Sequence, residues 1–165
     1  RPVTINGGMA MPAWYDIPGP DFRQRQDSAG IRASQQQLCA LIERELSRGI
    51  AAERILLAGF SQGGALVLHT GLRYPRPLAG VLVLSAYLPL ADTLQAEATA
   101  INRSVPLMLA HGRQDPVVPL SLAEQSRDLL QQQGYTVAWH TYAMAHAVCP
   151  EELLDIRAWL VDCLA

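Results

Sequence analysis

Short apolar runs alternate with amphipathic stretches along most of this 165-residue chain. The apolar runs predict four strands, at residues 54–59, 80–86, 105–112 and 136–142. In the first three runs the apolar residues follow one another without alternation, so we expect both faces of each strand to be buried. Such strands are typical of a parallel sheet that helices cover.

The amphipathic stretches predict helices at residues 28–48, 62–73, 119–133 and 150–164. Asp27 or Ser28 is the expected N-cap of the first helix and Gly49 its end, while Pro119 and Pro150 begin the last two. The second helix is apolar almost all round, which indicates a place against the centre of a sheet. Residues 91–103 are predicted as a loop or short helix, and the first 27 residues as loop.

This order of elements predicts an α/β fold in which a mostly parallel sheet carries helices on both faces. In such sheets ligands bind at the carboxyl ends of the strands. The length fits a single domain that spans residues 1–165.

A Gly-x-Ser-x-Gly motif lies where the first predicted strand meets the second predicted helix, with Ser61 between Gly59 and Gly63. This is the setting of a nucleophile elbow, in which a strained turn exposes the serine hydroxyl. We expect a side chain at either glycine to collide with the neighbouring strand or helix. The backbone N–H of Gln62, at the helix N-terminus, is the expected donor to an oxyanion. The alternative is an ordinary glycine-rich turn with an incidental serine.

A serine nucleophile needs a base and an acid, and both candidates follow later strands. His146 lies in the loop after the fourth predicted strand, and Asp115 lies just past the third. The order Ser61, Asp115, His146 is that of α/β-hydrolase triads. Alternatively, Asp115 only forms a turn before Pro116, and His146 is a surface residue.

Three other histidines fit the base less well. His69 lies about two turns into the buried helix and is expected in the core. His111 ends the third strand, where it is structural or near the site, and His140 lies within the fourth strand. Cys149, close to His146, is a rival thiol nucleophile that lacks an elbow.

The composition narrows the range of functions. Half of the residues are hydrophobic, 17% are charged and the net charge is −2, so neither a nucleic-acid surface nor an acidic tail is expected. The three cysteines have no metal-ligand or disulfide-framework spacing, which predicts a reducing, cytoplasmic location without a metal site. No apolar run has the length of a membrane span.

The sequence resembles the phospholipase/carboxylesterase family of α/β-hydrolases, and its bacterial carboxylesterases in particular. The resemblance rests on the segments "NGGMAMPAWYDI", "RILLAGFSQGGALVLHT", "GVLVLSAYLP", "HGRQDPVVP" and "VAWHTYAMAHAV". It implies that Ser61 is the nucleophile, Asp115 the acid and His146 the base, with no cofactor. The substrate contacts expected at the site are Trp14, Tyr15, Tyr87 and Leu88, although Trp14 and Tyr15 could instead anchor their loop to the core.

Two features depart from that family. Members commonly have glycine before the catalytic histidine, where this chain has Ala145, and alanine is strained if the backbone needs a positive φ. Members also have further strands, and a loop with a second oxyanion donor, before the point where this chain begins at Arg1. We therefore expect an N-terminally incomplete domain, with residues 54–59 forming an apolar edge of the sheet.

The predicted function is a serine carboxylesterase that hydrolyses small carboxylic esters through an acyl-enzyme. One alternative is a thioesterase that acts on acylated proteins or small thioesters with the same triad. Another is a non-catalytic relic or interaction module. The expected partner is a small ester or thioester, and a homodimer is possible.

Overall fold

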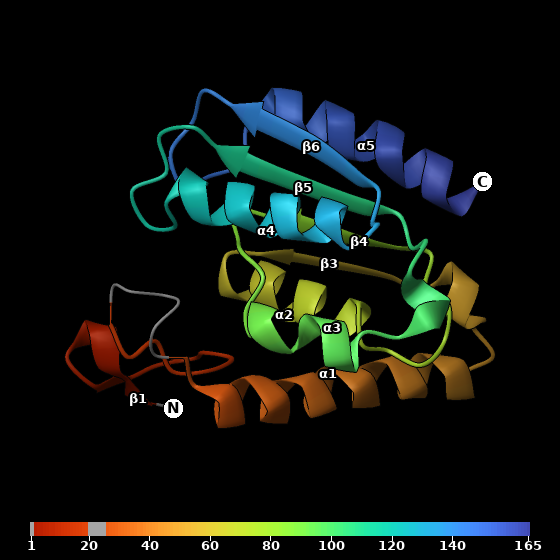
Figure 1. The fold of residues 1–165 in the computed structure, drawn as a ribbon, viewed down its shortest axis with the longest axis horizontal. Helices are drawn as coiled ribbons and strands as arrows, with labels where there is room; N and C mark the ends of the chain where they lie inside the picture. Colours follow the sequence, from red (N-terminus) through yellow and green to blue (C-terminus); the bar gives the residue numbers. More distant parts are fainter. Residues whose placement is uncertain (1, 20–25) are drawn as a thin grey trace.

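The computed structural model describes residues 2–19 and 26–165, and its centre is a parallel sheet of four strands. The strands are β3 (Leu56–Phe60), β4 (Gly80–Leu84), β5 (Leu107–Gly112) and β6 (Val137–Tyr142). Each strand pairs with the next one along the chain, in the order β3-β4-β5-β6 (Figure 1). All four predicted strands and their parallel arrangement are confirmed.

The predicted helices also form, with similar bounds. The helices are α1 (Ser28–Ser47), α2 (Gln62–Gly71), α3 (Leu94–Glu97), α4 (Leu120–Gln132) and α5 (Pro150–Leu164). The Asp27 carboxylate caps α1 by accepting a 2.8 Å hydrogen bond from the Gly30 N–H. Gly49 follows the end of α1 at a φ of 88°, a left-handed conformation that glycine adopts without strain. The short α3 lies within residues 91–103, as predicted.

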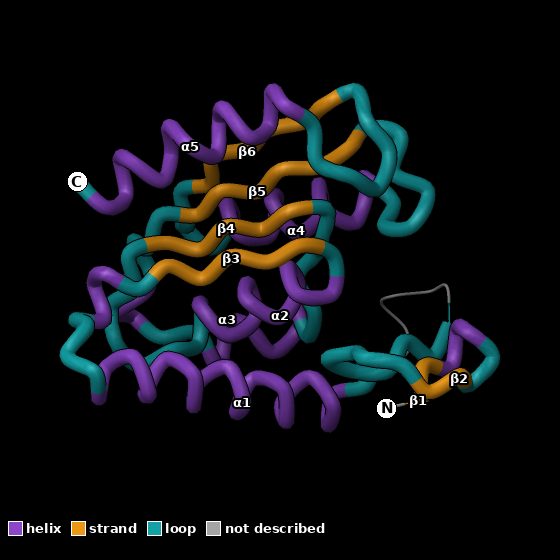
Figure 2. The backbone as a smooth tube through the Cα atoms, turned by 180° about the vertical axis from the view of Figure 1, so that it is seen from behind, coloured by secondary structure: helices purple, strands orange, loops and turns teal. Residues whose placement is uncertain are grey.

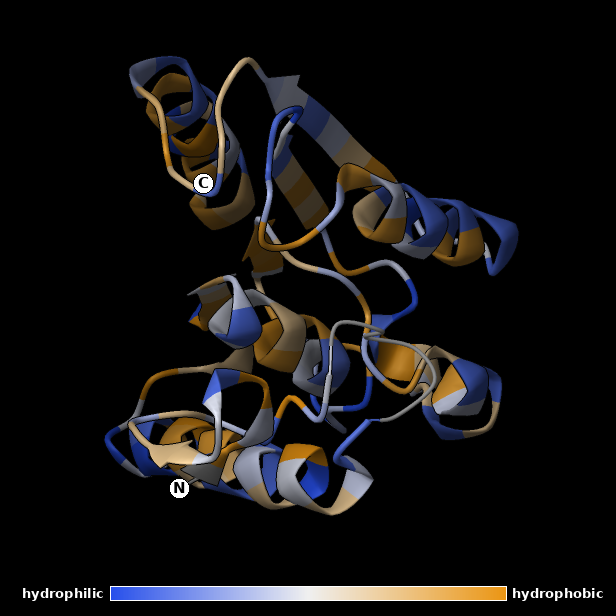
Figure 3. Cartoon of the chain, turned by 90° about the vertical axis from the view of Figure 1, so that its left-hand side faces the viewer, coloured by the Kyte–Doolittle hydropathy of each residue, from blue (hydrophilic) through white to orange (hydrophobic). Residues whose placement is uncertain are grey.

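Helices pack on both faces of the sheet. On one face, Leu57, Val81 and Leu107 contact a core to which α1, α2 and α4 contribute. On the other face, Leu82 and Met108 pack against α5, mainly through Ile156. Figure 2, seen from behind, places the sheet between these two layers of helices. In the view of Figure 3, apolar colours concentrate on the inner sides of the helices, while hydrophilic colours lie mainly on their outer sides.

Helix α2 crosses the centre of the first core, as its almost wholly apolar sequence predicts. Every residue from Gly64 to Gly71 is buried. The close approach of α2 to β4 depends on Gly71, because a Cβ there would lie 2.6 Å from a methyl group of Val81. Helix α2 is therefore packed directly against the sheet at β4.

The N-terminal segment is more ordered than the predicted loop. Strands β1 (Pro2–Val3) and β2 (Met9–Ala10) pair in antiparallel fashion around a short 3-10 turn, Thr4–Asn6. The Ile5 N–H donates a 2.9 Å hydrogen bond to the Ile17 carbonyl, which folds the segment back on itself. The segment lies toward the carboxyl ends of the sheet strands (Figure 1), where it contributes to the site.

Strand β3 forms one edge of the sheet in the part of the chain that the structure describes. On the face of β3 opposite α2, Ala58 is exposed and the Phe60 side chain is 38% exposed. The edge is thus apolar, as expected from the sequence. None of the helices in the described ranges is both long enough and apolar enough to cross a membrane.

Candidate active site

Ser61 lies in the sharp turn between β3 and α2. Its backbone has φ 54° and ψ −124°, a region that non-glycine residues rarely adopt. The Ser61 N–H donates a 2.8 Å hydrogen bond to the Leu84 carbonyl at the end of β4, which fixes the turn to the sheet. The predicted strained strand-to-helix turn is therefore confirmed.

The glycines around Ser61 differ from one another in their steric roles. A Cβ at Gly59 would lie 2.4 Å from the Gly63 carbonyl carbon, so that the strand could not approach the helix. A Cβ at Gly63 would lie 3.6 Å from its nearest atom, Nε1 of Trp14. The prediction of a collision at Gly63 is therefore wrong. The second close approach is at Gly64, whose Cβ would lie 2.8 Å from Cβ of Ala86. Helix α2 turns Gly63 outward and Gly64 toward the sheet.

Three predicted site residues from three different loops form one hydrogen-bonded chain. The distance from Ser61 Oγ to His146 Nε2 is 2.9 Å, and that from His146 Nδ1 to Asp115 Oδ2 is 2.7 Å. A carboxylate can only accept, so Nδ1 carries the proton that it donates to Asp115. The Nε2 lone pair is then free to accept the Ser61 proton.

Asp115 is held as a buried carboxylate by its own loop. Its side chain is fully buried, and Oδ1 accepts hydrogen bonds from the N–H groups of Val117 (2.8 Å) and Val118 (2.9 Å). Burial raises the pKa of this carboxyl, but the hydrogen bonds from His146, Val118 and Val117 outweigh it, and the pKa lies below its ordinary value. A negative charge therefore stays beside the imidazole.

The loop that carries His146 approaches β5 through a glycine. A Cβ at Gly112 would lie 2.3 Å from the Ala145 carbonyl oxygen, so a larger residue there would push the loop away. Ala145 does not have a positive φ; in the described part of the chain only Ser61, Ser85 and Leu90 do so among residues other than glycine. The strain expected from alanine before His146 is therefore absent.

The predicted oxyanion donor also has suitable geometry. Gln62 is the first residue of α2, and N–H groups in the first turn of a helix have no acceptor within that helix. The positive end of the helix dipole lies at the same point, beside the Ser61 hydroxyl. A negative oxygen that forms on a substrate at Ser61 would be stabilised here.

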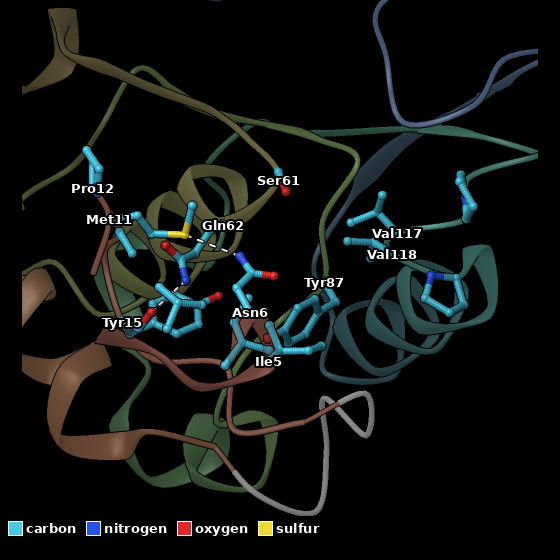
Figure 4. Close-up of a pocket in the computed structure, with 15 residues that line it drawn as sticks. Ile5, Asn6, Met11, Pro12, Tyr15, Ser61, Gln62, Tyr87, Val117 and Val118 are labelled. Atoms are coloured by element: carbon cyan, nitrogen blue, oxygen red, sulfur yellow. Dashed lines mark hydrogen bonds between the residues drawn. The ribbon is translucent and has the colours of Figure 1, made fainter. Parts of the chain in front are cut away.

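An apolar cavity of about 520 Å³ opens at Ser61. Its walls come from the N-terminal segment, from Tyr87 and from the loop after Asp115, as Figure 4 shows for Ile5, Val117 and Val118. The volume lies within the usual range for small-molecule sites. Sequence reasoning predicted Tyr15 and Tyr87 but missed the other walls, because apolar residues in loops have no periodicity that indicates a cavity.

An open groove lies on the other side of Ser61. It is lined by Pro12, Ala13, Trp14, Gln37, Phe60, Ser61, Gln62 and Gly63. Of the predicted substrate contacts, Tyr15 and Tyr87 line the apolar cavity and Trp14 lines the open groove. Leu88 lines neither, since it lies at a separate depression between Tyr87 and α4. Tyr15 is also 3% exposed, so it anchors its loop as well.

The remaining candidates lie outside the triad. His69 is fully buried in the core as expected, with Nε2 3.2 Å from Gln35 Oε1. His111 is buried beside the site, where its Nε2 lies 2.9 Å from the Val118 carbonyl oxygen. His140 instead faces α5, 3.5 Å from Asp155. Cys149 is the N-cap residue of α5 and lines neither the cavity nor the groove.

Taken together, a parallel sheet, a strained serine at a strand-to-helix turn, and an imidazole and carboxylate in line define the α/β-hydrolase class. Residues 1–164 match the model of the Phospholipase/Carboxylesterase family. The chain belongs to this family and is a hydrolase of the esterase and thioesterase type.

Individual relatives of the chain carry names that bear on the substrate class. The chain is 43% identical to acyl-protein thioesterase 1 of Gibberella zeae over 167 residues, which cover 96% of this chain and 71% of that protein. Among solved structures, Arabidopsis thaliana SOBER1 matches with a TM-score of 0.92 at 28% identity, covering 99% of this chain and 80% of the other. Zea mays acyl-protein thioesterase 2 matches with a TM-score of 0.85 at 30% identity, covering 100% and 78%. These names favour the thioesterase alternative over the predicted small-ester carboxylesterase and its bacterial branch.

Proposed function

We propose that this protein hydrolyses thioesters of apolar acyl chains through an acyl-enzyme on Ser61. The observation that carries the proposal is the position of Ser61, whose hydroxyl is hydrogen-bonded to His146 and also lines the apolar cavity. A serine in this position brings the nucleophile and an acyl-binding surface together. The names of the relatives at 43% identity support the thioester as the substrate class.

In the first half of the reaction, Ser61 Oγ attacks the carbonyl carbon of the thioester while its proton passes to His146 Nε2. The carbonyl oxygen becomes an oxyanion beside the Gln62 N–H. Asp115 stabilises the imidazolium through the 2.7 Å hydrogen bond to Nδ1. The C–S bond then breaks, the sulfur takes the proton from His146, and the acyl group stays on Ser61 as an ester.

In the second half, water attacks the acyl-enzyme and passes its proton to His146 Nε2. A second oxyanion forms at the same place and collapses, which breaks the bond between the acyl carbon and Ser61 Oγ. The serine oxygen recovers its proton from His146, and the carboxylic acid leaves. The net reaction consumes one water and regenerates the starting enzyme.

The two sides of Ser61 suit different parts of a thioester. The apolar cavity is lined by residues such as Ile5, Tyr15 and Val118, and it can remove a hydrocarbon chain from water. Each Å² of apolar surface buried in this way contributes about 25 cal/mol to binding. The open groove beside Trp14 and Phe60 has room for the leaving group. We therefore place the acyl chain in the cavity and the thiol, including one on a peptide, in the groove.

A matched pair of substrates separates the thioesterase from the carboxylesterase. An S-octanoyl cysteine peptide and the corresponding O-octanoyl serine peptide differ in one atom, and acid release from each can be followed by chromatography. We expect kcat/KM for the thioester to be at least about tenfold higher, because a thiolate, with a pKa of about 8.5 for its thiol, leaves more readily than an alkoxide. An equal or higher value for the serine peptide would support the carboxylesterase instead.

The catalytic role of Ser61 is tested with a matched serine. Ser85 also has a positive φ (49°) and follows the neighbouring strand, but its buried hydroxyl has no hydrogen-bond partner in the described residues. We expect Ser61→Ala to abolish thioester turnover and labelling by a fluorophosphonate probe, and Ser85→Ala to keep both. Turnover or labelling that survives Ser61→Ala would exclude the serine mechanism and support a non-catalytic protein or another nucleophile.

A further inference from the structure

The side chain of Gln62 makes two hydrogen bonds that its proposed oxyanion role does not use. Its Oε1 accepts a 2.7 Å hydrogen bond from the Trp14 N–H, and its Nε2 donates a 2.8 Å hydrogen bond to the Tyr15 carbonyl (Figure 4 shows the latter). The partners settle the orientation of the amide, because an N–H can only donate and a carbonyl can only accept. One side chain on α2 thus holds backbone groups of two consecutive residues in a distant loop, the Trp14 N–H and the Tyr15 carbonyl.

The segment that Gln62 holds lies between the apolar cavity and the open groove. Pro12 and Ala13 line both of them, while Tyr15 lines only the cavity and Trp14 only the groove. Residues 12–15 therefore form a partition between the two sides of Ser61. The partition contains no regular secondary structure that would supply hydrogen bonds to its backbone.

The partition has a second anchor that is independent of Gln62. The Ser34 hydroxyl on α1 donates to the Trp14 carbonyl. The Tyr15 ring is buried beneath, with its hydroxyl hydrogen-bonded to Tyr87. Gln62 on α2 and Ser34 on α1 therefore hold the same part of the partition from two different helices.

We infer that Gln62 is a positioning residue whose side chain fixes this partition and thereby sets the preference for long acyl chains. The inference rests on the proposed function, since it concerns the acyl side of the same site. Without the two hydrogen bonds the partition shifts relative to Ser61, and the mouth of the apolar cavity loses its shape. A long chain then loses contacts with the wall, whereas an acetyl group is too short to use them.

The test compares kcat/KM for S-octanoyl and S-acetyl thioesters of one thiol in the full chain. Gln62→Met keeps the size of the side chain but removes both hydrogen bonds. Its octanoyl-to-acetyl ratio should fall about tenfold or more, since tenfold corresponds to roughly one of the two net hydrogen bonds removed. Gln62→Glu keeps the acceptor for Trp14 and faces the Tyr15 carbonyl with an oxygen, so its ratio should also fall. Gln36→Met, at an exposed position on α1, is the matched control and should keep the wild-type ratio.

Active sites are counted with a fluorophosphonate probe, so that unfolded or inactive molecules do not enter the ratio. A purely structural role of Gln62 would lower kcat/KM equally for the octanoyl and acetyl thioesters. The ratio would then stay unchanged, and this result would overturn the inference. Should the Gln62 variants fail to fold, Ser34→Ala loosens the same partition from α1 and should lower the ratio in the same direction. An unchanged ratio in folded Ser34→Ala would then overturn the inference. Failure of the proposed function is distinct, because it appears as equal or faster hydrolysis of the O-octanoyl serine peptide, or as turnover that persists in Ser61→Ala.

Discussion

The turn around Ser61 predicts that alanine is tolerated at one glycine of the Gly-x-Ser-x-Gly motif and not at the other. Gly59→Ala adds a Cβ 2.4 Å from two backbone atoms of Gly63, whereas Gly63→Ala adds one whose nearest neighbour is 3.6 Å away. Ordinary contacts begin at 3.4 Å, so the first variant requires a movement of 3.4 − 2.4 = 1.0 Å and the second requires none. Neither an alanine Cβ nor the backbone that it meets has a rotamer by which to escape.

The expected stabilities follow from these distances. Overpacking of a well-packed core costs about 1–3 kcal/mol, and a contact with rigid backbone belongs at the upper end, so we expect Gly59→Ala to lose about 3 kcal/mol. Gly63→Ala exchanges a helical glycine for alanine without a collision and should be unchanged or up to about 1 kcal/mol more stable. The two variants should thus differ by about 3–4 kcal/mol, a large part of the stability of a typical domain.

The same displacement should lower the activity of Gly59→Ala. A shift of about 1 Å at the turn carries Ser61 out of its 2.9 Å hydrogen bond with His146, and a misplacement of this size costs about 100-fold in kcat. The measurements are urea unfolding followed by fluorescence, and turnover of an acyl thioester corrected for folded protein. Equal unfolding midpoints for Gly59→Ala and Gly63→Ala would refute the steric argument.

Three further predictions concern single side chains. Asp115→Asn should lower kcat by about 10⁴-fold, because asparagine favours the wrong tautomer of the His146 imidazole. The control Asp128→Asn, at an exposed position, should keep the wild-type kcat. Similar kinetics for the two variants would mean that another carboxylate acts. Burial, with a further effect of the Arg73 charge, lowers the pKa of His69 to about 4. The free energy of unfolding should therefore fall by up to about 3 kcal/mol as the pH drops from about 6.5 to about 4. His69→Gln lacks this titrating group, so the difference in unfolding free energy between wild type and variant should change with pH. A difference that stays constant with pH would contradict this prediction. Cys149→Ser should keep full turnover, and a loss matched by iodoacetamide inactivation would favour the thiol nucleophile.

The sequence by itself was enough to predict the four strands of the parallel sheet, the long helices and the three residues of the candidate triad. Strands such as β4 and helices such as α2 follow from local apolar patterns, which are written in consecutive residues. The positions of Asp115 and His146 followed as well, because carboxyl ends of parallel strands lie at one edge of a sheet. These inferences need only local periodicity and a known rule of topology.

Other features could be found only in the tertiary structure. Which glycine of the motif is sterically required depended on the rotation of α2, which turns Gly64 rather than Gly63 toward the sheet. Whether Ala145 is strained depended on its φ in the folded loop, which the residue type does not determine.

The walls of the site were also decided by contacts between distant segments. The cavity joins the N-terminal segment to Val117 and Val118, and Gln62 binds Trp14 across 48 positions of the chain. A local pattern reports how one segment buries its own surface, whereas a cavity wall depends on which remote backbone atoms the fold brings within hydrogen-bond distance. The three residues of the candidate triad could therefore be predicted from the sequence, while most of the wall of the cavity could not.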